Sequence, residues 1–313
     1  MISCVEFIPA YSELFSFLDE NYTHKEVENF WKYLFEPTGK GIPLINFAKK
    51  DGLRGCFNYW RGTLTEEAAN VKMQLNEKAG WFTSHTYYCP SKGRLLELQK
   101  EIGFEPYYDY CGHCDYYRAS LEKVGLTWIR NHLNVDKGEC SRVLYDPKVF
   151  KGVLNMDENV EVFEMRAEDV EYFHPDFHSS MNMGIDYVGK NHGEEMLYKY
   201  LKRYTLNVYK KTIEAMKENP LKGIENKIKE TYILEKAEDA IEIISDEKSL
   251  RVKVKYCPAV KHLKNTGREV SKYFSFTTKG VMQTLAEIGN LKFDFISYDD
   301  ETGKAEYAFY VKD

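Results

Sequence analysis

The residues best suited to chemistry in the first half of the chain are cysteines and histidines. Two thiols occur at C-x-x-C spacing, in Cys111-Gly112-His113-Cys114. Thiolates at this spacing can bind one metal ion, such as zinc or another divalent metal. His132 and Cys140 belong to an expected hairpin that follows, and either could complete the ligand set. The candidate metal ligands are therefore Cys111, His113, Cys114, His132 and Cys140.

Two other interpretations of this cluster stay open. The residues could be small, partly buried side chains at the start of a helix. Cys111 and Cys114 could instead form a redox dithiol, although the βαβ context of a thioredoxin-like motif is missing from the surrounding sequence. Because only one C-x-x-C pair is present, the spacing alone does not choose among a metal site, a redox pair and a structural role.

A second candidate site is the run His174-Pro175-Asp176-Phe177-His178. Residues four apart lie on one face of a helix, so His174 and His178 could meet one metal ion or one substrate. Asp176 is close enough in sequence to orient one imidazole. These three residues are the candidate catalytic groups. The alternative is two exposed histidines at a helix N-terminus, with Pro175 in the first turn.

The tripeptide Tyr-Cys-Pro occurs twice, at 88–90 and 256–258. Each occurrence closes an alternating, strand-like run and opens an apolar-periodic, helix-like one. Further matches follow in the same order along the chain, which indicates an internal duplication. Because both halves contain the tripeptide, Cys89 and Cys257 are interpreted as buried structural thiols at a strand-to-helix joint.

The elements expected in each copy position these residues. Helices, a hairpin, two more helices and a second hairpin indicate an α+β fold, made of two tandem copies of a helices-plus-antiparallel-hairpins unit. One helix of the first copy is expected at about 43–50. The half-sheets of the two copies could pair with each other. The expected boundaries are a first copy at 1–147, a linker with a short strand at 148–172 and a second copy at 173–313.

Composition excludes several classes of protein. The chain has 313 residues, 43% hydrophobic and 15% aromatic, which is enough for folded cores. A net charge of −6 without a basic stripe argues against nucleic acid, and no apolar run reaches membrane-spanning length. The first residues lack a signal-peptide pattern and seven cysteines indicate reduced thiols, so we expect a cytoplasmic protein. Motifs of kinases, nucleotide dehydrogenases and common serine hydrolases are not found.

Several short motifs of the second half resemble a known family. They are His174-Pro175-Asp176-Phe177-His178, Gly184-Ile185-Asp186-Tyr187, Gly193-Glu194-Glu195, Tyr256-Cys257-Pro258-Ala259-Val260 and the segment from Tyr298-Asp299 to Tyr310. Together they resemble the L-2-amino-thiazoline-4-carboxylic acid hydrolase-like family, with a fainter likeness in the first half. The resemblance implies hydrolytic opening of a small cyclic substrate at a C–N or C–C ring bond. Such a reaction needs a water activated by a base or a metal, which would be the role of His174 and His178.

A fainter resemblance covers Cys114 to Cys140. A helix, a hairpin and a late cysteine are similar to the vinyl-reductase-like small-molecule-sensing domains, some of which hold structural zinc, although the cysteine spacing here departs from theirs. The leading hypothesis is a cytoplasmic hydrolase acting on a small cyclic compound. The alternative is a non-enzymatic small-molecule-binding module with structural zinc. The expected partner is a small molecule, with no nucleic acid and no membrane, and a homodimer is possible.

Overall fold

The computed structural model describes residues 1–35 and 43–312 and has an α+β fold, as predicted. The strands form two antiparallel sheets, and the half-sheets of the two halves belong to different sheets rather than to one. The chain divides into two compact units. We call residues 22–174 the central unit. Residues 1–21 together with the chain from Pro175 onward are the composite unit.

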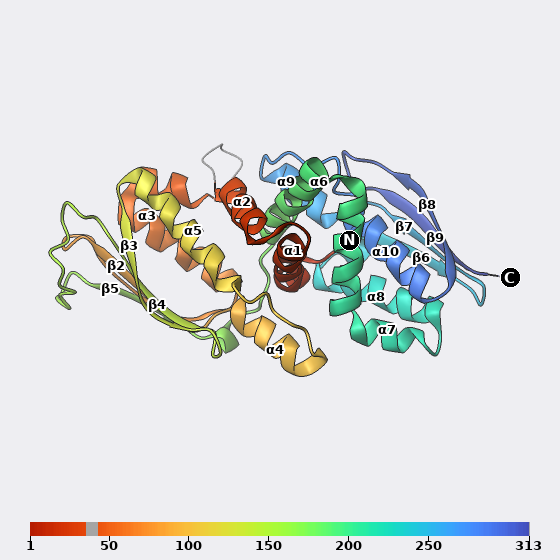
Figure 1. The fold of residues 1–313 in the computed structure, drawn as a ribbon, viewed down its shortest axis with the longest axis horizontal. Helices are drawn as coiled ribbons and strands as arrows, with labels where there is room; N and C mark the ends of the chain where they lie inside the picture. The colour runs from red at the N-terminus through yellow and green to blue at the C-terminus, as the bar shows by residue number, and fades with distance from the viewer. Residues whose placement is uncertain (36–42, 313) are drawn as a thin grey trace. The chain divides into compact units, whose positions relative to one another are not determined.

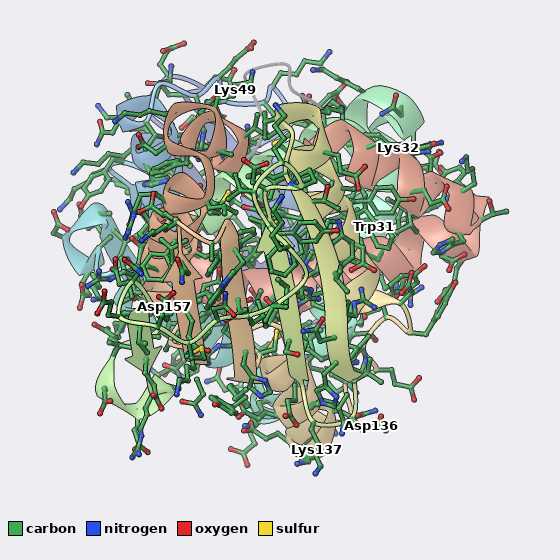
Figure 2. The ribbon with its side chains drawn as sticks, turned by 90° about the vertical axis from the view of Figure 1, so that its left-hand side faces the viewer. Trp31, Lys32, Lys49, Asp136, Lys137 and Asp157 are labelled. Atoms are coloured by element: carbon green, nitrogen blue, oxygen red, sulfur yellow. The ribbon has the colours of Figure 1, made fainter. Side chains whose placement is uncertain are left out.

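The central unit has a five-stranded sheet with α3 and α5 on one face (Figure 1). The strands lie in the order β3-β4-β2-β1-β5, and Asp136 and Lys137 mark the turn between β3 and β4 (Figure 2). Its helices are α2 (His24–Phe35), α3 (Leu44–Glu66), α4 (Lys92–Ile102) and α5 (His113–Ala119). Its strands are β1 (Asn70–Asn76), β2 (Trp81–Tyr88), β3 (Thr127–Asn134), β4 (Glu139–Tyr145) and β5 (Glu161–Met165).

Alternation along β1 explains which face of this sheet is buried. Val71, Met73 and Leu75 point to one side and belong to the same apolar cluster as Phe57 of α3. Burying side chains of this size contributes about 1.5–3 kcal/mol each. Helix α3 is longer than the helix predicted at 43–50. The chain passes through Gly52 at φ 55°, which glycine tolerates, and then resumes the helix as far as Glu66.

The composite unit has a four-stranded sheet in the order β6-β7-β9-β8, against which α8 and α10 pack. Helix α6 changes direction at Gly193, whose φ is 84°. The helices are α1 (Phe7–Tyr22), α6 (Phe177–Val208), α7 (Lys210–Met216), α8 (Pro220–Leu234), α9 (Pro258–Asn265) and α10 (Phe276–Ile288). The strands are β6 (Ile241–Ser245), β7 (Ser249–Val254), β8 (Leu291–Tyr298) and β9 (Ala305–Val311).

Helix α1 packs with the second half of the chain, although the sequence assigned it to a first copy at 1–147. The ring of Phe7 stacks on Phe177 with 4.6 Å between centroids. Tyr200 of α6 donates to the carbonyl of Ala10 at 2.8 Å. These contacts explain why the compact units do not coincide with the predicted boundaries at 147 and 173.

The two sheets agree in strand order. β3-β4-β2-β1 in the central unit corresponds to β8-β9-β7-β6 in the composite unit. This agreement is what an internal duplication would produce, and the duplication itself stays a prediction. The short strand expected within 148–172 is present as β5, which pairs with β1 as an additional edge strand. Among the residues described, no helix combines the length and apolar character needed to cross a membrane.

Candidate functional site

The C-x-x-C pair lies where a short 3₁₀ turn leads into α5. Cys111 is in the turn Tyr110–Gly112, and Cys114 is in the first turn of α5. His113 lies between them in sequence, and its Nε2 is 3.5 Å from the Sγ of Cys114. Its Nδ1 faces the carbonyl oxygen of Tyr110. The imidazole therefore contacts a thiol directly.

Two further thiols, on or next to strands of the sheet, lie near the C-x-x-C pair. Cys140 of β4 pairs with Thr86 of β2 and is 8% exposed, on the same face as the buried side chains of β1. Cys89 follows the end of β2, and its backbone N–H donates to the carbonyl of Gly138 at 2.7 Å. This bond ties Cys89 to the β3–β4 hairpin that carries Cys140. The sequence had assigned Cys89 a structural role only.

The neighbouring thiols affect the pKa of Cys89 and of Cys111. Burial raises the pKa of Cys89, and the charges of Cys114, Cys140 and Cys111 raise it further. Burial, followed by the charge of Cys114, raises the pKa of Cys111 to about 12. Cys114 and Cys140 are thus close enough to Cys89 and Cys111 to oppose the ionisation of these two thiols.

Positive charge gathers beside the same thiols. Arg142 is 6% exposed and donates from Nη1 to the Sγ of Cys140 at 2.7 Å. Its buried Nε has no hydrogen-bond partner in the described part of the chain. Burial by itself would raise the pKa of Cys114, but His113, Arg142 and Arg118 hold it well below the ordinary value. These charges therefore favour the thiolate form of Cys114, which is the form that binds metal.

His132 lies away from this cluster. Its strand partner is Ser141, whereas Leu133 pairs with Cys140, so His132 and Cys140 are on opposite faces of the sheet. The Nε2 of His132 is 3.7 Å from Glu139, which also pairs with His85 at 3.2 Å. The bulge after Arg130 sets this register. Of the predicted ligands, Cys111, His113, Cys114 and Cys140 lie in this cluster, which also contains Cys89.

The three candidate catalytic residues have separate partners. Helix α6 begins at Phe177, so His174 precedes the helix and does not share a helical face with His178. His174 pairs through Nδ1 with Glu66 at 2.5 Å, within the central unit. Asp176 accepts hydrogen bonds from Arg268 and lies 3.3 Å from His262.

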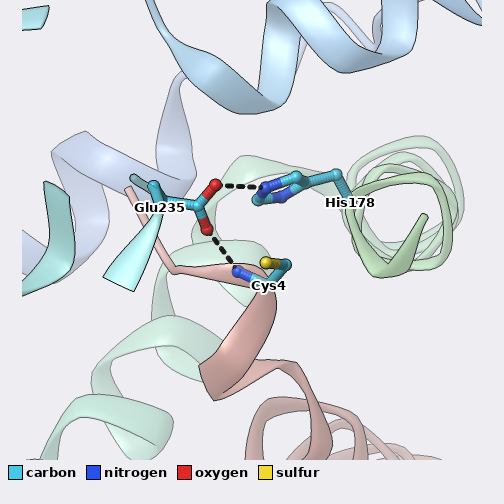
Figure 3. Close-up of side chains that lie close together, drawn as sticks. All are labelled: Cys4, His178 and Glu235. Atoms are coloured by element: carbon cyan, nitrogen blue, oxygen red, sulfur yellow. Dashed lines mark hydrogen bonds and ion pairs between the residues drawn. The ribbon is translucent and has the colours of Figure 1, made fainter. Parts of the chain in front are cut away.

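His178 belongs to a buried group that the sequence did not predict. Its Nε2 lies 2.9 Å from Oε2 of Glu235, while Oε1 of Glu235 accepts the backbone N–H of Cys4 at 2.6 Å (Figure 3). Cys4 and His178 are 1% and 2% exposed. One ligand atom from each of the three side chains lies within 4.8 Å of the others, which no other set of three His, Cys, Asp or Glu residues achieves in residues 1–35 and 43–312.

The charges of this group follow from its burial. Burial, and then the charge of Glu235, raise the pKa of the Cys4 thiol, so Cys4 is not an activated nucleophile. Burial would also raise the pKa of Glu235, but His178 and the hydrogen bond from Cys4 hold it below the ordinary value. No spacing signal could have found the group, because Cys4 and Glu235 are 231 residues apart. The one local signal is the S-x-x-E capping box of Ser3 and Glu6, which fixes the turn that begins at Cys4.

The central unit also has an open groove of about 590 Å³. Tyr87, which lines the groove, is 51% exposed. The guanidinium of Arg94 lies 3.4 Å from the ring centroid of Tyr172, and its Nε has no hydrogen-bond partner among the described residues. The lining includes Asn70, Tyr87, Tyr88, Arg94, Glu97 and Arg166.

Comparisons of the chain with models of protein families, with curated proteins and with solved structures each gave no match. Both resemblances noted in the sequence therefore stay predictions. The function is inferred below from the geometry of the thiol cluster and of the groove.

Proposed function

We propose that the protein is a small-molecule-binding module whose central unit is stabilised by a zinc ion. The observation that carries the proposal is the convergence of four cysteines from three separate segments beside a buried arginine. Four thiolates are a complete ligand set for structural zinc. The ligands would be Cys89, Cys111, Cys114 and Cys140.

The charges around the thiols fit such an ion. Four thiolates and one Zn²⁺ carry a net charge of about −2. Arg142 and Arg118 both lower the pKa of Cys114, so their two positive charges lie close enough to compensate. Hydrogen bonds from such outer groups normally support thiolate ligands. The zinc would supply folding energy, because it would link β4, the end of β2 and the start of α5.

The thiols would have to approach one another on binding. No three of them have all their sulfur atoms within 4.8 Å of each other in the described chain. Cys114 contacts His113 and Cys140 contacts Arg142 instead. The side chains of His113 and Arg142 are flexible, so they can move away from the sulfur atoms and leave room for an ion between the thiols.

The groove is the surface where we place the small molecule. Arg94 offers a buried N–H without a partner, and its guanidinium is held against Tyr172. Arginine forms paired hydrogen bonds with carboxylates. The exposed ring of Tyr87 offers an apolar, flat surface. The favoured ligand class is an aromatic or heterocyclic molecule that bears a carboxylate.

Hydrolysis of a small cyclic compound stays a prediction with less support. His174 pairs with Glu66, Asp176 with Arg268 and His178 with Glu235. The group that contains His178 is nearly closed to solvent. A hydrolase needs a substrate to reach the base or metal. The open groove contains neither of these histidines among its lining residues.

Metal analysis tests the first part of the proposal. The purified full chain is expected to contain zinc, and the variant with Cys111→Ser and Cys114→Ser is expected to lose one equivalent. Cys56→Ser is the matched control, because Cys56 is a free thiol of the same unit with 0% exposure. Retention of the full zinc content by the double variant would refute the proposed ligand set.

Ligand titration tests the second part. Benzoate is the probe, and binding to the full chain is followed by calorimetry or by NMR shifts of groove residues. Arg94→Gln should weaken binding by about tenfold or more, since a charge-assisted hydrogen bond contributes about 1.5–3 kcal/mol. Arg251→Gln, a half-exposed arginine of β7, should not change it. No saturable binding, or equal loss in both variants, would exclude the groove as a carboxylate site.

A further inference from the structure

The ends of three helical elements meet at the buried group of Cys4, His178 and Glu235 in the composite unit. Cys4 starts a 3₁₀ turn, His178 is in the first turn of α6, and Glu235 caps the C-terminus of α8. The capping box holds Cys4 in place, with Ser3 Oγ accepting the N–H of Val5 at 3.1 Å. The capping box thus fixes the backbone turn that carries Cys4.

The donor set is that of a transition-metal site. A thiolate, an imidazole and a carboxylate together suit zinc and the neighbouring divalent ions. Ligand atoms bound to a tetrahedral zinc are roughly 3.3–3.8 Å apart, from metal–ligand distances of about 2.0–2.3 Å. Here the three ligand atoms all lie within 4.8 Å, and Nε2 of His178 is 2.9 Å from Oε2 of Glu235. Small side-chain adjustments would bring them to a common ion.

The charges also balance in a place that excludes water. A divalent ion with one thiolate, one carboxylate and one neutral imidazole has no net charge. Burial of a neutral group costs far less than burial of an unpaired charge. Cys4 and His178 are 1% and 2% exposed, so neutrality is what this location requires.

We propose that Cys4, His178 and Glu235 bind one zinc or similar divalent transition-metal ion, and that the ion fastens the N-terminal segment to the rest of the composite unit. Residues 1–21 are separated in sequence from the chain that they pack against. A link between Cys4 and Glu235 closes a loop of 231 residues, and closing long loops removes much freedom from the unfolded chain. This site lies in a different unit from the four-cysteine cluster, so neither proposal depends on the other.

Cobalt titration of the full chain tests the site. The protein carries Cys111→Ser and Cys114→Ser, so that two thiols of the central unit cannot contribute, and is freed of metal beforehand. Co²⁺ should bind with one equivalent and give the sulfur-to-cobalt charge-transfer band of a single thiolate. Adding Cys4→Ser should remove the band and weaken binding by more than about 100-fold, beyond the loss typical of an outer residue. Adding Cys257→Ser instead should change neither, since Cys257 is a buried thiol of the same unit that is not in the group.

Two further variants keep the test decisive if Cys4→Ser does not fold. His178→Gln and Glu235→Gln retain polar side chains of similar size, and each should weaken Co²⁺ binding by a similar factor. Hydrogen exchange of the α1 amides should slow when Co²⁺ is added, and should not respond to Co²⁺ in either variant. An absence of bound Co²⁺, a band that survives Cys4→Ser, or α1 exchange that ignores the metal would overturn the proposal.

Discussion

Nε2 of His178 lies 2.9 Å from Oε2 of Glu235, and both side chains are almost completely buried, with 2% and 3% exposed. His174 makes the corresponding pair with Glu66, whose side chain is 53% exposed. The two histidines of one sequence motif therefore differ in what their removal would leave behind. One leaves a buried carboxylate, and the other leaves a carboxylate in water.

His178→Ala should destabilise the metal-free protein by about 3–5 kcal/mol, because it leaves the charge of Glu235 buried without a partner. His174→Ala should cost about 1 kcal/mol, because Glu66 can be hydrated. Urea unfolding of the full chain, followed separately for each unit by fluorescence and hydrogen exchange, measures both. Equal losses would contradict the different roles of the two pairs.

Cys114 should be the most reactive thiol of the metal-free central unit. His113 and the arginines hold the pKa of Cys114 well below its ordinary value, so Cys114 ionises more readily than Cys111, whose pKa burial raises to about 12. Iodoacetamide should therefore modify Cys114 first, because the thiolate is the reactive form. His113→Gln should slow this reaction. Mass spectrometry of the labelled peptides gives the order, and labelling of Cys111 first would disprove this account of the charges.

Glu67 should make the folded protein less stable as the pH rises, which is opposite to the effect of a carboxylate with a lowered pKa. Burial raises its pKa from 4.5 to about 7, despite the opposing charge of His174. Between these values the folded state holds more protons than the unfolded state, so this carboxyl reduces stability as the pH rises from about 4.5 to 7. Glu67→Gln should stabilise the protein by about 1–3 kcal/mol at pH 8 and leave it unchanged near pH 4. Denaturation midpoints at the two pH values decide this, with Glu158→Gln on the exposed loop as the control.

Two glycines of α3 should respond to alanine in opposite directions. A Cβ on Gly55 would lie 2.0 Å from the carbonyl oxygen of Phe47, whereas a Cβ on Gly62 would have no neighbour within 4 Å. Gly55→Ala should destabilise by about 1–3 kcal/mol or more through this clash. Gly62→Ala should stabilise by about 0.5–1 kcal/mol, since it restricts the unfolded chain in a helical position. Thermal unfolding compares them, and a tolerated Gly55→Ala would show that the break at Gly52 can open.

The sequence predicted the elements whose signals are local. The strand-like run that ends at the first Tyr-Cys-Pro is β2, and the hairpin expected to carry His132 and Cys140 is formed by β3 and β4. The extent of α3 was underestimated, because the chain resumes the helix after the break at Gly52. Whether helix α1 joins one half or the other depends on contacts such as Phe7 with Phe177, which no local pattern encodes.

The candidate sites were harder to predict for the same reason. Repetition of Tyr-Cys-Pro made Cys89 look purely structural, yet only its place beside the β3–β4 hairpin brings it to Cys140. The helix was expected to include His174, but it starts at Phe177. The spacing of four residues between His174 and His178 therefore does not place them on one helical face. Cys4 and Glu235 are far apart in sequence, and only the tertiary fold brings them into contact.

Metal content of Cys89→Ser tests the central claim most directly, because the two Tyr-Cys-Pro cysteines differ only in their surroundings. The full chain and Cys257→Ser should contain the same number of zinc ions per chain by elemental analysis, and Cys89→Ser should contain one fewer. Each variant is compared at equal, verified folding by circular dichroism. Equal zinc in Cys89→Ser and Cys257→Ser, or no zinc in the full chain purified without chelator, would contradict the four-cysteine site.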